Sequence, residues 1–320
     1  MNYFGMAKRL SEKSIAKRIS AVDLDLIISW PAEELPLLFG AADAVRRRFF
    51  GNQVNPCTLM NVKSGACSED CAFCSQSAHN ATSITVTPLA KPEEIRMQAD
   101  RAAKLGLPFC VVSSGRRISK KEVSAIAEAI APTSCEKHAS LGILDADDFV
   151  LLKNAGVVCY NHNLETSRSY FSRIVTTHTY DDRVATVKLA KASGMRVCCG
   201  GIVGLGESWE QRKEFCLELA ALDVDTVPIN FLNAIPGTRV SAPRESPLEF
   251  LKIVSLFRLA LPDKTIKVCG GREKNLGDLQ CLIFSAGANG YVTGGYLTTP
   301  GAGIEHDDAM IAAMGLSRPL

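Results

Sequence analysis

The sequence lacks an excess of charge of either sign and has no dense basic segment. Its 320 residues contain 36 Lys and Arg against 34 Asp and Glu, which gives a formal net charge of +2. The richest basic stretch, Arg46 to Arg48, is short and is followed by two Phe residues. Because nucleic-acid binding needs clustered positive charge to meet the phosphates, this distribution argues against nucleic acid as a partner.

The sequence also lacks a long uninterrupted apolar run. Charges are scattered through its first residues, including Lys8, Arg9 and Glu12, where a signal peptide would have an apolar segment. No stretch has the length and apolarity of a membrane-spanning helix. We therefore expect no membrane as a partner and a cytoplasmic location.

Cysteine, in contrast, is abundant, with 12 residues. The cytosol keeps thiols reduced, so a large chain of this kind is expected to use cysteines for metal or redox chemistry rather than disulfide bonds. A free Cys can also pack as a small apolar side chain. Cys216, inside the helical pattern at residues 209–222, is expected to be such a core residue.

After a helical preface, short apolar runs rich in Val, Ile and Cys alternate with amphipathic stretches. Eight runs are predicted as strands, at residues 58–62, 109–113, 139–143, 157–163, 196–203, 226–231, 265–269 and 290–293. Five stretches between them are predicted as helices, at residues 93–105, 121–130, 183–192, 209–222 and 247–261. This alternation is typical of parallel βα units. Eight units close into an α/β fold of the (β/α)₈ TIM-barrel type.

An open, doubly wound sheet is the alternative to a barrel. The first predicted strand is not followed by the G-x-G-x-x-G motif of a dinucleotide-binding sheet. Polar residues and Cys recur at the carboxyl ends of the predicted strands, which form the catalytic face of a barrel. We expect an N-terminal helical extension at residues 1–50 and a barrel with a C-terminal tail at residues 51–320, with no low-complexity linker between them.

Cys67, Cys71 and Cys74 follow the first predicted strand with the spacing C-x₃-C-x₂-C. Gly65 permits the sharp bends that converging thiolates require. A 4Fe-4S cluster held by three thiolates leaves one iron open to a substrate or cosubstrate. Zinc with His79 as fourth ligand is the alternative, but structural zinc sites usually have a second pair of ligands farther along the chain, and none is evident.

The C-x₃-C-x₂-C spacing, with Phe73 just before the last Cys, resembles the signature of the radical S-adenosylmethionine superfamily. The resemblance implies that the three cysteines are the catalytic cluster ligands and that the open iron binds S-adenosylmethionine, with Phe73 in the cofactor site. It also implies that one electron cleaves the sulfonium to give methionine and a 5′-deoxyadenosyl radical, which removes hydrogen from unactivated carbon.

Six further sequence blocks, within about residues 55–300, are similar to the biotin synthase family. They are residues 65–77, 160–167, 200–207, 227–232, 271–273 and 286–289. The resemblance implies sulfur insertion into dethiobiotin, with two hydrogen abstractions that each use one S-adenosylmethionine and an auxiliary iron–sulfur cluster as sulfur donor. It also implies a homodimer and a flavodoxin- or ferredoxin-type reductant.

The same resemblance places Asn161, Asn163 and Asn230 in the dethiobiotin pocket, and Glu165 and Arg183 at the ribose and methionine ends of S-adenosylmethionine. Residues 161, 163 and 165 are two apart, so on a strand all three would face the barrel interior. Asn side chains offer the paired donors and acceptors that a ureido ring needs. A solvated strand face is the alternative, but an inner barrel strand has none.

Glycines follow the fifth predicted strand region, where Gly200 and Gly201 are expected in the cofactor site. Glycine permits close approach of the backbone to a ligand, although glycine-rich stretches also mark simple turns.

A second metal site departs from the family pattern. Biotin synthases hold a 2Fe-2S auxiliary cluster on three Cys and one Arg, and two of those Cys positions match Cys110 and Cys198. The third Cys position falls on His138, and the Arg position falls on Lys267. Both departures concern the same site.

Two other cysteines are candidates for the missing ligand. Cys135 lies three residues before His138, which on a strand is about 10 Å away and on the opposite face. Cys269 lies two residues beyond Lys267, on the same face. We predict that Cys269, with Cys110 and Cys198, binds an altered auxiliary cluster of 2Fe-2S or 4Fe type, with His138 as a candidate fourth ligand and Lys267 as a charged neighbour. Alternatively, Cys269 is core filler and His138 is a hydrogen-bonded polar residue.

Two other functions remain open at this point. A related radical enzyme, such as a hydrogenase-cofactor maturase or a carbon-skeleton mutase, would keep Cys67, Cys71 and Cys74 but would not need a sacrificial cluster. A non-catalytic iron–sulfur scaffold or electron carrier would not need a large polar pocket.

Overall fold

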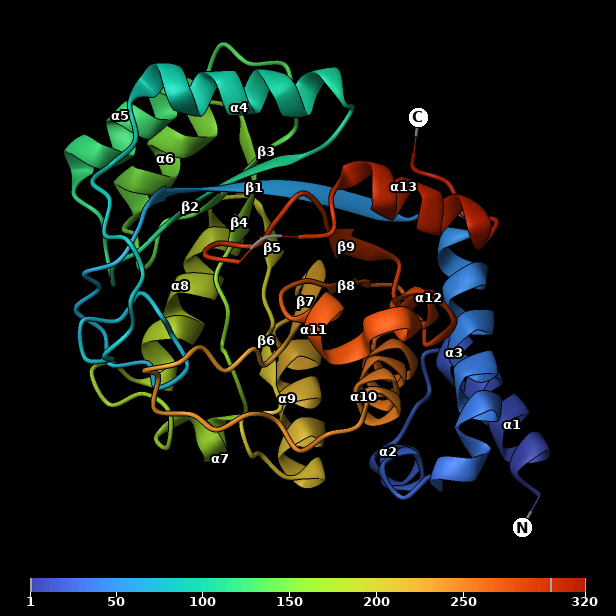
Figure 1. The fold of residues 1–320 in the computed structure, drawn as a ribbon. Helices are drawn as coiled ribbons and strands as arrows, with labels where there is room; N and C mark the ends of the chain where they lie inside the picture. The colour runs from blue at the N-terminus through green and yellow to red at the C-terminus, as the bar shows by residue number, and fades with distance from the viewer. Residues whose placement is uncertain (1, 300, 320) are drawn as a thin grey trace.

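The computed structural model describes residues 2–299 and 301–319 and shows parallel strands surrounded by helices (Figure 1). Residues 1, 300 and 320 lie outside the described residues. Residue 1 begins the expected N-terminal extension, and residue 320 ends the expected barrel domain. The strands are β1 (Asn55–Lys63), β2 (Phe109–Ser113), β3 (Lys137–Ser140), β4 (Val157–Asn161), β5 (Arg196–Cys198), β6 (Gly201–Val203), β7 (Thr226–Phe231), β8 (Thr265–Val268) and β9 (Gly290–Val292).

Helices precede the first strand and alternate with the later ones. The α-helices are α1 (Tyr3–Ile15), α2 (Ala21–Ile28), α3 (Leu35–Phe50), α4 (Pro92–Lys104), α5 (Lys120–Ile130), α6 (Ala146–Asn154), α7 (Arg168–Phe171), α8 (Tyr180–Ala192), α9 (Trp209–Ala221), α10 (Pro247–Ala260), α11 (Arg272–Leu276), α12 (Leu282–Ser285) and α13 (Ile304–Ala313). The 3₁₀ helices are η1 (Ala32–Glu34) and η2 (Gly277–Cys281).

The strands form one closed parallel barrel. Their order is β5-β4-β3-β2-β1-β9-β8-β7-β6, and a pairing between β5 and β7 joins the two ends. β5 and β6 together occupy one position, so the barrel has the eight positions of a TIM-type fold. The predicted (β/α)₈ architecture is therefore confirmed.

The prediction of one continuous strand at residues 196–203 was wrong. The strand breaks between Cys198 and Gly201, because the backbone at Gly200 passes very close to β7. A Cβ atom on Gly200 would lie 2.8 Å from Pro228 Cδ and still closer to the Pro228 carbonyl oxygen. This close approach is a tertiary contact, which a local apolar pattern does not reveal.

The strand predicted at residues 157–163 is shorter than expected, and Asn163 and Glu165 lie beyond it. β4 ends at Asn161, and Glu165 has a φ of +73°, which an extended strand does not contain. The amides of Leu164 and Glu165 instead donate to the Gly200 carbonyl, at 3.0 and 3.2 Å. The segment after β4 therefore runs beside the break between β5 and β6 and bonds the backbone there.

The outer helices begin where the sequence provides side-chain caps. Each of five helices starts with a capping box, in which the cap side chain and the third helical residue bond each other's backbone amides. The caps are Ser119, Asp145, Thr179, Ser208 and Ser246. These caps fix the points at which the chain leaves the catalytic face of the barrel.

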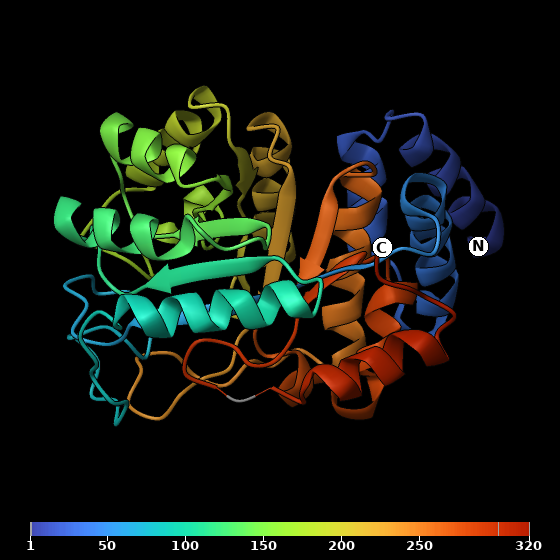
Figure 2. The same ribbon diagram turned by 90° about the horizontal axis from the view of Figure 1, so that it is seen from above.

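The N-terminal helices pack on one side of the barrel, against α10 (Figure 2). Ser14 donates its hydroxyl to the Leu259 carbonyl at 2.7 Å, and Lys252 donates to the carbonyls of Ile28 and Trp30 at 2.7 and 2.9 Å. Because α10 lies between these helices and the strands, residues 250–259 are all buried. No helix in the described residues is long and apolar enough to cross a bilayer.

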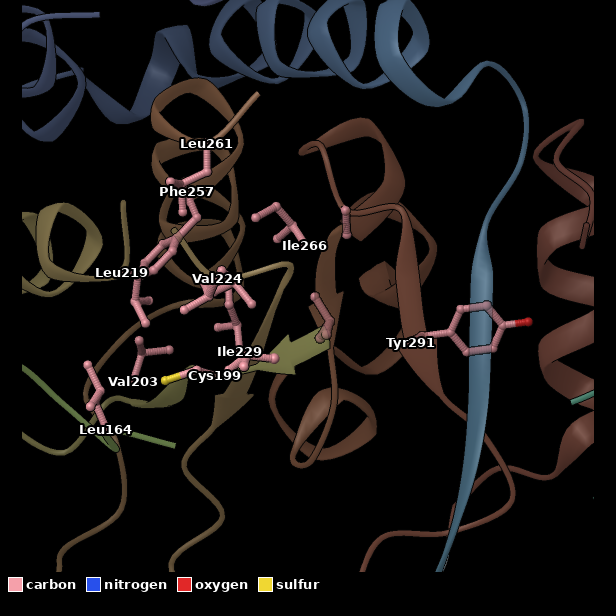
Figure 3. Packing of buried hydrophobic residues seen from close by; sticks show 14 of the residues in the cluster. Leu164, Cys199, Val203, Leu219, Val224, Ile229, Phe257, Leu261, Ile266 and Tyr291 are labelled. Carbon is pink, nitrogen blue, oxygen red and sulfur yellow. The ribbon is translucent and has the colours of Figure 1, made fainter. Parts of the chain in front are cut away.

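Apolar side chains fill the layer between the barrel strands and the outer helices. Figure 3 shows Cys199 among them, close to Val203 and Ile229, with its sulfur in the apolar layer. Cys216 is fully buried in the same core, as predicted. These two cysteines therefore pack as apolar side chains.

Candidate active site

A cavity of about 340 Å³ opens at the carboxyl ends of the strands and extends down between them. This volume lies within the usual range for small-molecule sites. The cavity brings together most of the residues predicted from the sequence, namely Cys67, Cys71, Phe73, Cys74, Cys110, Asn161, Asn163, Glu165, Arg183, Cys198, Asn230, Lys267 and Cys269. Gly200, Gly201, His138 and Cys135 are not among the described residues that line it.

The loop after β1 folds tightly around the three motif cysteines. Gly65 begins it with a φ of +75°, as expected of a sharp bend. The amide of Cys67 donates to the Gln76 carbonyl at 3.0 Å. The Asn80 side chain donates to the carbonyls of Cys71 and Cys74, at 3.1 and 2.8 Å. These bonds hold the loop closed while all three thiols remain on the cavity wall.

Within the described residues, the motif cysteines do not converge on the position of a single zinc ion. In residues 2–299 and 301–319, no three His, Cys, Asp or Glu side chains are placed to hold one metal ion. Thiolates of a cluster bind separate irons and so stand farther apart than ligands of one ion. His79, the candidate zinc ligand, is exposed, and its Nε2 atom lies 3.0 Å from the Ser68 carbonyl oxygen.

Burial disfavours ionisation of the Cys71 and Cys74 thiols in the absence of a metal. It raises the pKa of Cys71 above its ordinary value and that of Cys74 to about 11. A cluster iron replaces the proton and supplies the positive charge that a buried thiolate needs. The chemistry of the donor set is thus consistent with a bound cluster.

A chain of hydrogen bonds connects the cluster loop to the cavity wall. Glu69, inside the cysteine motif, bonds Nδ1 of His178. Arg183 donates its Nε–H to Nε2 of His178 at 2.9 Å, and its Nη1 group to the Asn163 carbonyl at 2.8 Å and to Glu165 at 3.2 Å. Because Nε2 accepts from Arg183, His178 is a neutral ring that donates from Nδ1.

The pKa shifts in this chain have a common cause. Burial, and then the Arg183 charge, lowers the pKa of His178, which agrees with the neutral ring. Burial also raises the pKa of Glu165, against the effect of Arg183. The position of Glu69 within the motif was a usable sequence signal, but His178 carried none, because it lies more than 100 residues from its partner.

Each of the three predicted asparagines already makes hydrogen bonds within the protein through both its side-chain oxygen and its NH₂ group. The Asn161 amide donates to Cys110 Sγ at 3.4 Å. Asn163 accepts from the Gly200 amide at 3.2 Å. Asn230 accepts from the Gly270 amide at 2.9 Å and donates to the Gly201 carbonyl at 3.1 Å. Each side-chain NH₂ group has two hydrogens, so each keeps donor capacity toward the cavity.

Gly200 and Gly201 shape the strand break beside the cavity. A Cβ atom on Gly201 would lie 2.8 Å from Glu165 Cα and still closer to the Glu165 carbonyl. The amide of Ile202 donates to that carbonyl at 2.8 Å. Gly201 therefore positions Glu165 through the backbone.

A second group of thiols lines the part of the cavity formed by the strands themselves. Cys110 on β2, Cys198 on β5 and Cys269 just after β8 all contribute to it, as does Cys57 on β1. Burial raises the pKa of Cys110, Cys198 and Cys269 well above the ordinary thiol value. Cys57 was missed by sequence reasoning, because the first strand was predicted to begin one residue after it.

Lys267 lies within this second group. Its ammonium is 3.2 Å from Cys57 Sγ. Burial alone lowers the pKa of Lys267, but the neighbouring Cys57, Cys198 and Cys269 outweigh it and raise the pKa above the ordinary value. Lys267 is therefore the positive charge among these thiols.

His138 and Cys135 are directed elsewhere. The Nε2 atom of His138 lies 2.7 Å from Oε1 of Glu136, which also accepts from Arg196 at 2.7 Å. These contacts lower the pKa of Glu136 to about 2, with the His138 hydrogen bond as the largest cause. Cys135 is buried, and its Sγ atom lies 3.6 Å from the Thr133 hydroxyl. The structure thus brings Cys269, but neither of these residues, to the second thiol group.

Comparisons with solved structures agree with the barrel. A methylornithine synthase superposes with a TM-score of 0.86 over 97% of both chains, at 22% identity. The FeFe-hydrogenase maturase of Carboxydothermus hydrogenoformans superposes with a TM-score of 0.80 over 97% of this chain and 78% of its own, at 17% identity. At these identities the likeness concerns the fold.

Sequence comparisons identify the family. The Radical SAM superfamily profile matches residues 61–219, and the Biotin and Thiamin Synthesis associated domain matches residues 228–317. A biotin synthase of Desulfatibacillum aliphaticivorans is 50% identical over 300 residues, which are 92% of each chain. One of Geobacter sulfurreducens is 47% identical over 319 residues, 98% of this chain and 96% of its own. The chain therefore belongs to the biotin synthase family of radical S-adenosylmethionine enzymes.

Proposed function

We propose that this enzyme converts dethiobiotin to biotin with two separate iron–sulfur sites in one barrel. The observation that carries the proposal is that both groups of cysteines line a single cavity, one in the loop above the strands and one between the strands. A radical enzyme without sulfur transfer needs the first group alone. The second group is therefore the feature that favours sulfur insertion over the maturase-like and mutase-like alternatives.

Cys67, Cys71 and Cys74 hold the first cluster. A 4Fe-4S cluster there supplies the electron that opens the sulfonium of S-adenosylmethionine. Arg183 and Glu165 are mostly, but not fully, buried and are paired, so they present fixed charges to the amino acid and ribose ends of that cofactor. Phe73 contributes an apolar wall, and Gly201 sets the backbone of Glu165.

Asn161, Asn163 and Asn230 bind dethiobiotin. A ureido ring carries two N–H donors and one carbonyl acceptor, which amide side chains match. Asn161 also contacts the Cys110 thiol at 3.4 Å, so a ligand held by Asn161 would lie next to the second thiol group. This adjacency supports sulfur transfer over a short path.

Cys110, Cys198 and Cys269 hold the auxiliary cluster, of 2Fe-2S or 4Fe type, which supplies the sulfur. Lys267 offsets part of the negative charge of the thiolates. The closed barrel wall excludes bulk water from this region, which protects reactive species.

The electron donor is a flavodoxin- or ferredoxin-type protein, and the enzyme is a homodimer, as the family resemblance implies. A cytoplasmic location is consistent with the cysteines, because all twelve are free thiols. A reducing compartment preserves such thiols for cluster assembly.

An anaerobic single-turnover assay tests this function. The chain is reconstituted with iron and sulfide, mixed with S-adenosylmethionine, dithionite and dethiobiotin, and analysed for 5′-deoxyadenosine and biotin by mass spectrometry. We expect both products, and we expect neither from Cys67→Ala. The Cys216→Ser variant, altered in the core, serves as the matched control. Deoxyadenosine without biotin, with both sites loaded, would contradict the assignment of the substrate.

A further inference from the structure

We propose that Cys57 is the fourth ligand of the auxiliary cluster, which is therefore held by four cysteines. The inference rests on the proposed function, because it concerns the sulfur-donor site. It differs from the pattern of three Cys and one Arg that family resemblance implies. The four thiols are those of Cys57, Cys110, Cys198 and Cys269, all of which line the cavity.

Cys57 is on the inner wall of the barrel, next to another of the proposed ligands. It pairs with Val292 on β9, and Cys57, Val292 and Cys269 form a small buried cluster apart from the main apolar core. Cys57 and Cys269 thus approach each other across β9 from strands β1 and β8. On the other side of β1, Leu59 is the register partner of Cys110. Cys57 therefore closes the ring of thiols between Cys110 and Cys269.

The ammonium group of Lys267 has no carboxylate partner among the described residues. Its side chain is buried, and its ammonium group donates to Cys57 Sγ at 3.2 Å. A buried, unpaired ammonium is costly. Thiolates bound to iron supply the missing negative charge, so the position of Lys267 is explained if Cys57 is one of them.

An ammonium group also cannot take the ligand role that the family assigns to this position. It has three donors and no acceptor lone pair. The loss of that ligand and the presence of an additional cavity-lining thiol 3.2 Å away are therefore complementary. Four thiolates are the usual ligand set of both 2Fe-2S and 4Fe-4S clusters.

The other candidates for the fourth ligand do not line the described cavity, and each already has a hydrogen-bond partner. His138 bonds Glu136 at 2.7 Å and does not line the cavity. Cys159, also absent from the described lining, has its Sγ 3.6 Å from Asn161 Oδ1. Cys57 is thus favoured over both by position.

The test isolates the auxiliary site by removing the other cluster. The parent is the variant Cys67→Ala/Cys71→Ala/Cys74→Ala, reconstituted anaerobically with ferrous iron and sulfide. Iron and sulfide per chain, Mössbauer spectra and iron X-ray absorption are measured. We expect a cluster with an all-sulfur iron shell in the parent. We expect Cys57→Ser on that background to bind iron at least roughly tenfold more weakly, since even an outer-shell loss has an effect of this size. Cys216→Ser, which alters a cysteine buried in the apolar core, is the control and should match the parent.

Lys267→Gln gives an independent readout. We expect it to retain the iron and to lower the midpoint potential of the cluster, because a positive charge that favours the added electron is removed. Circular dichroism of the apo forms identifies any variant that fails to fold. The X-ray absorption of the parent tests the assignment even if the Cys57 variant does not fold, because the parent keeps Cys57.

Each negative outcome has a distinct meaning. Unchanged iron, sulfide and spectra in Cys57→Ser, or nitrogen or oxygen ligands in the iron shell of the parent, would overturn the assignment of Cys57 but leave the sulfur-donor site intact. A parent that binds no iron or sulfide would overturn the auxiliary cluster itself, and with it the proposed function.

Discussion

Gly201→Ala is predicted to destabilise the fold and weaken cofactor binding together. The added Cβ would lie 2.8 Å from Glu165 Cα, where non-bonded carbon atoms prefer at least about 3.5 Å. The neighbouring backbone must therefore move by roughly 1 Å. Overpacking of this kind costs about 1–3 kcal/mol of unfolding free energy.

The displaced backbone carries Glu165, so the effect reaches the site. Glu165 lies 3.2 Å from the Arg183 guanidinium, and its carbonyl accepts from Ile202 at 2.8 Å. Denaturant unfolding of the apo chain measures the first effect, and calorimetric titration of the cluster-loaded chain with S-adenosylmethionine measures the second. Gly40→Ala is the matched control, because Gly40 lies inside α3 and a Cβ atom there would meet nothing within 4 Å. This substitution is expected to raise the free energy of unfolding by about 0.5–1 kcal/mol. Wild-type stability and cofactor affinity in Gly201→Ala would refute the reasoning.

Three other perturbations have defined outcomes. His178→Phe removes the hydrogen-bonded link between Glu69 in the cluster loop and Arg183. Iron affinity at the cysteine motif should therefore fall by about 10–100-fold, as after the loss of other outer-shell partners. Iron retention during chelator titration measures this affinity, and wild-type retention would contradict the role of the link. Arg258→Met leaves the buried carbonyls of Pro262 and Gly287 without their Arg258 donor, so it should cost at least about 3 kcal/mol of unfolding free energy. An unchanged denaturation midpoint would contradict this. Iron removal by an anaerobic chelator should lower the melting temperature, since bound clusters stabilise the native state. The far-UV circular dichroism should remain, because the apolar core does not depend on the metal. Loss of the dichroism would show that the barrel depends on the clusters.

The barrel was predictable because its signals are local. The alternation of apolar patterns predicts parallel βα units. The polar carboxyl ends of the strands and the missing G-x-G-x-x-G motif then favour the closed barrel over an open sheet. The errors arose where distant segments decide the local structure. The break at Gly200 follows from the approach of Pro228, and the end of β4 follows from bonds to the Gly200 carbonyl. Neither contact is visible in a sequence window.

The site shows the same division. The spacing of Cys67, Cys71 and Cys74 is a local motif, and their grouping on one wall follows from a short loop. Cys57 escaped notice because strand ends are uncertain by a residue or more, and it lies at the edge of its predicted strand. His178 reaches Glu69 only through the closure of the barrel, so no spacing in the sequence could indicate the pair.

The most direct test of the central claim follows the sulfur atom. The enzyme is reconstituted with ³⁴S-sulfide, freed of excess sulfide, and allowed one turnover with dethiobiotin, S-adenosylmethionine and dithionite. The account predicts biotin that carries ³⁴S, together with a loss of cluster sulfide that matches the biotin formed. Biotin with sulfur of natural abundance, or biotin formed while the auxiliary cluster keeps all of its sulfide, would contradict it.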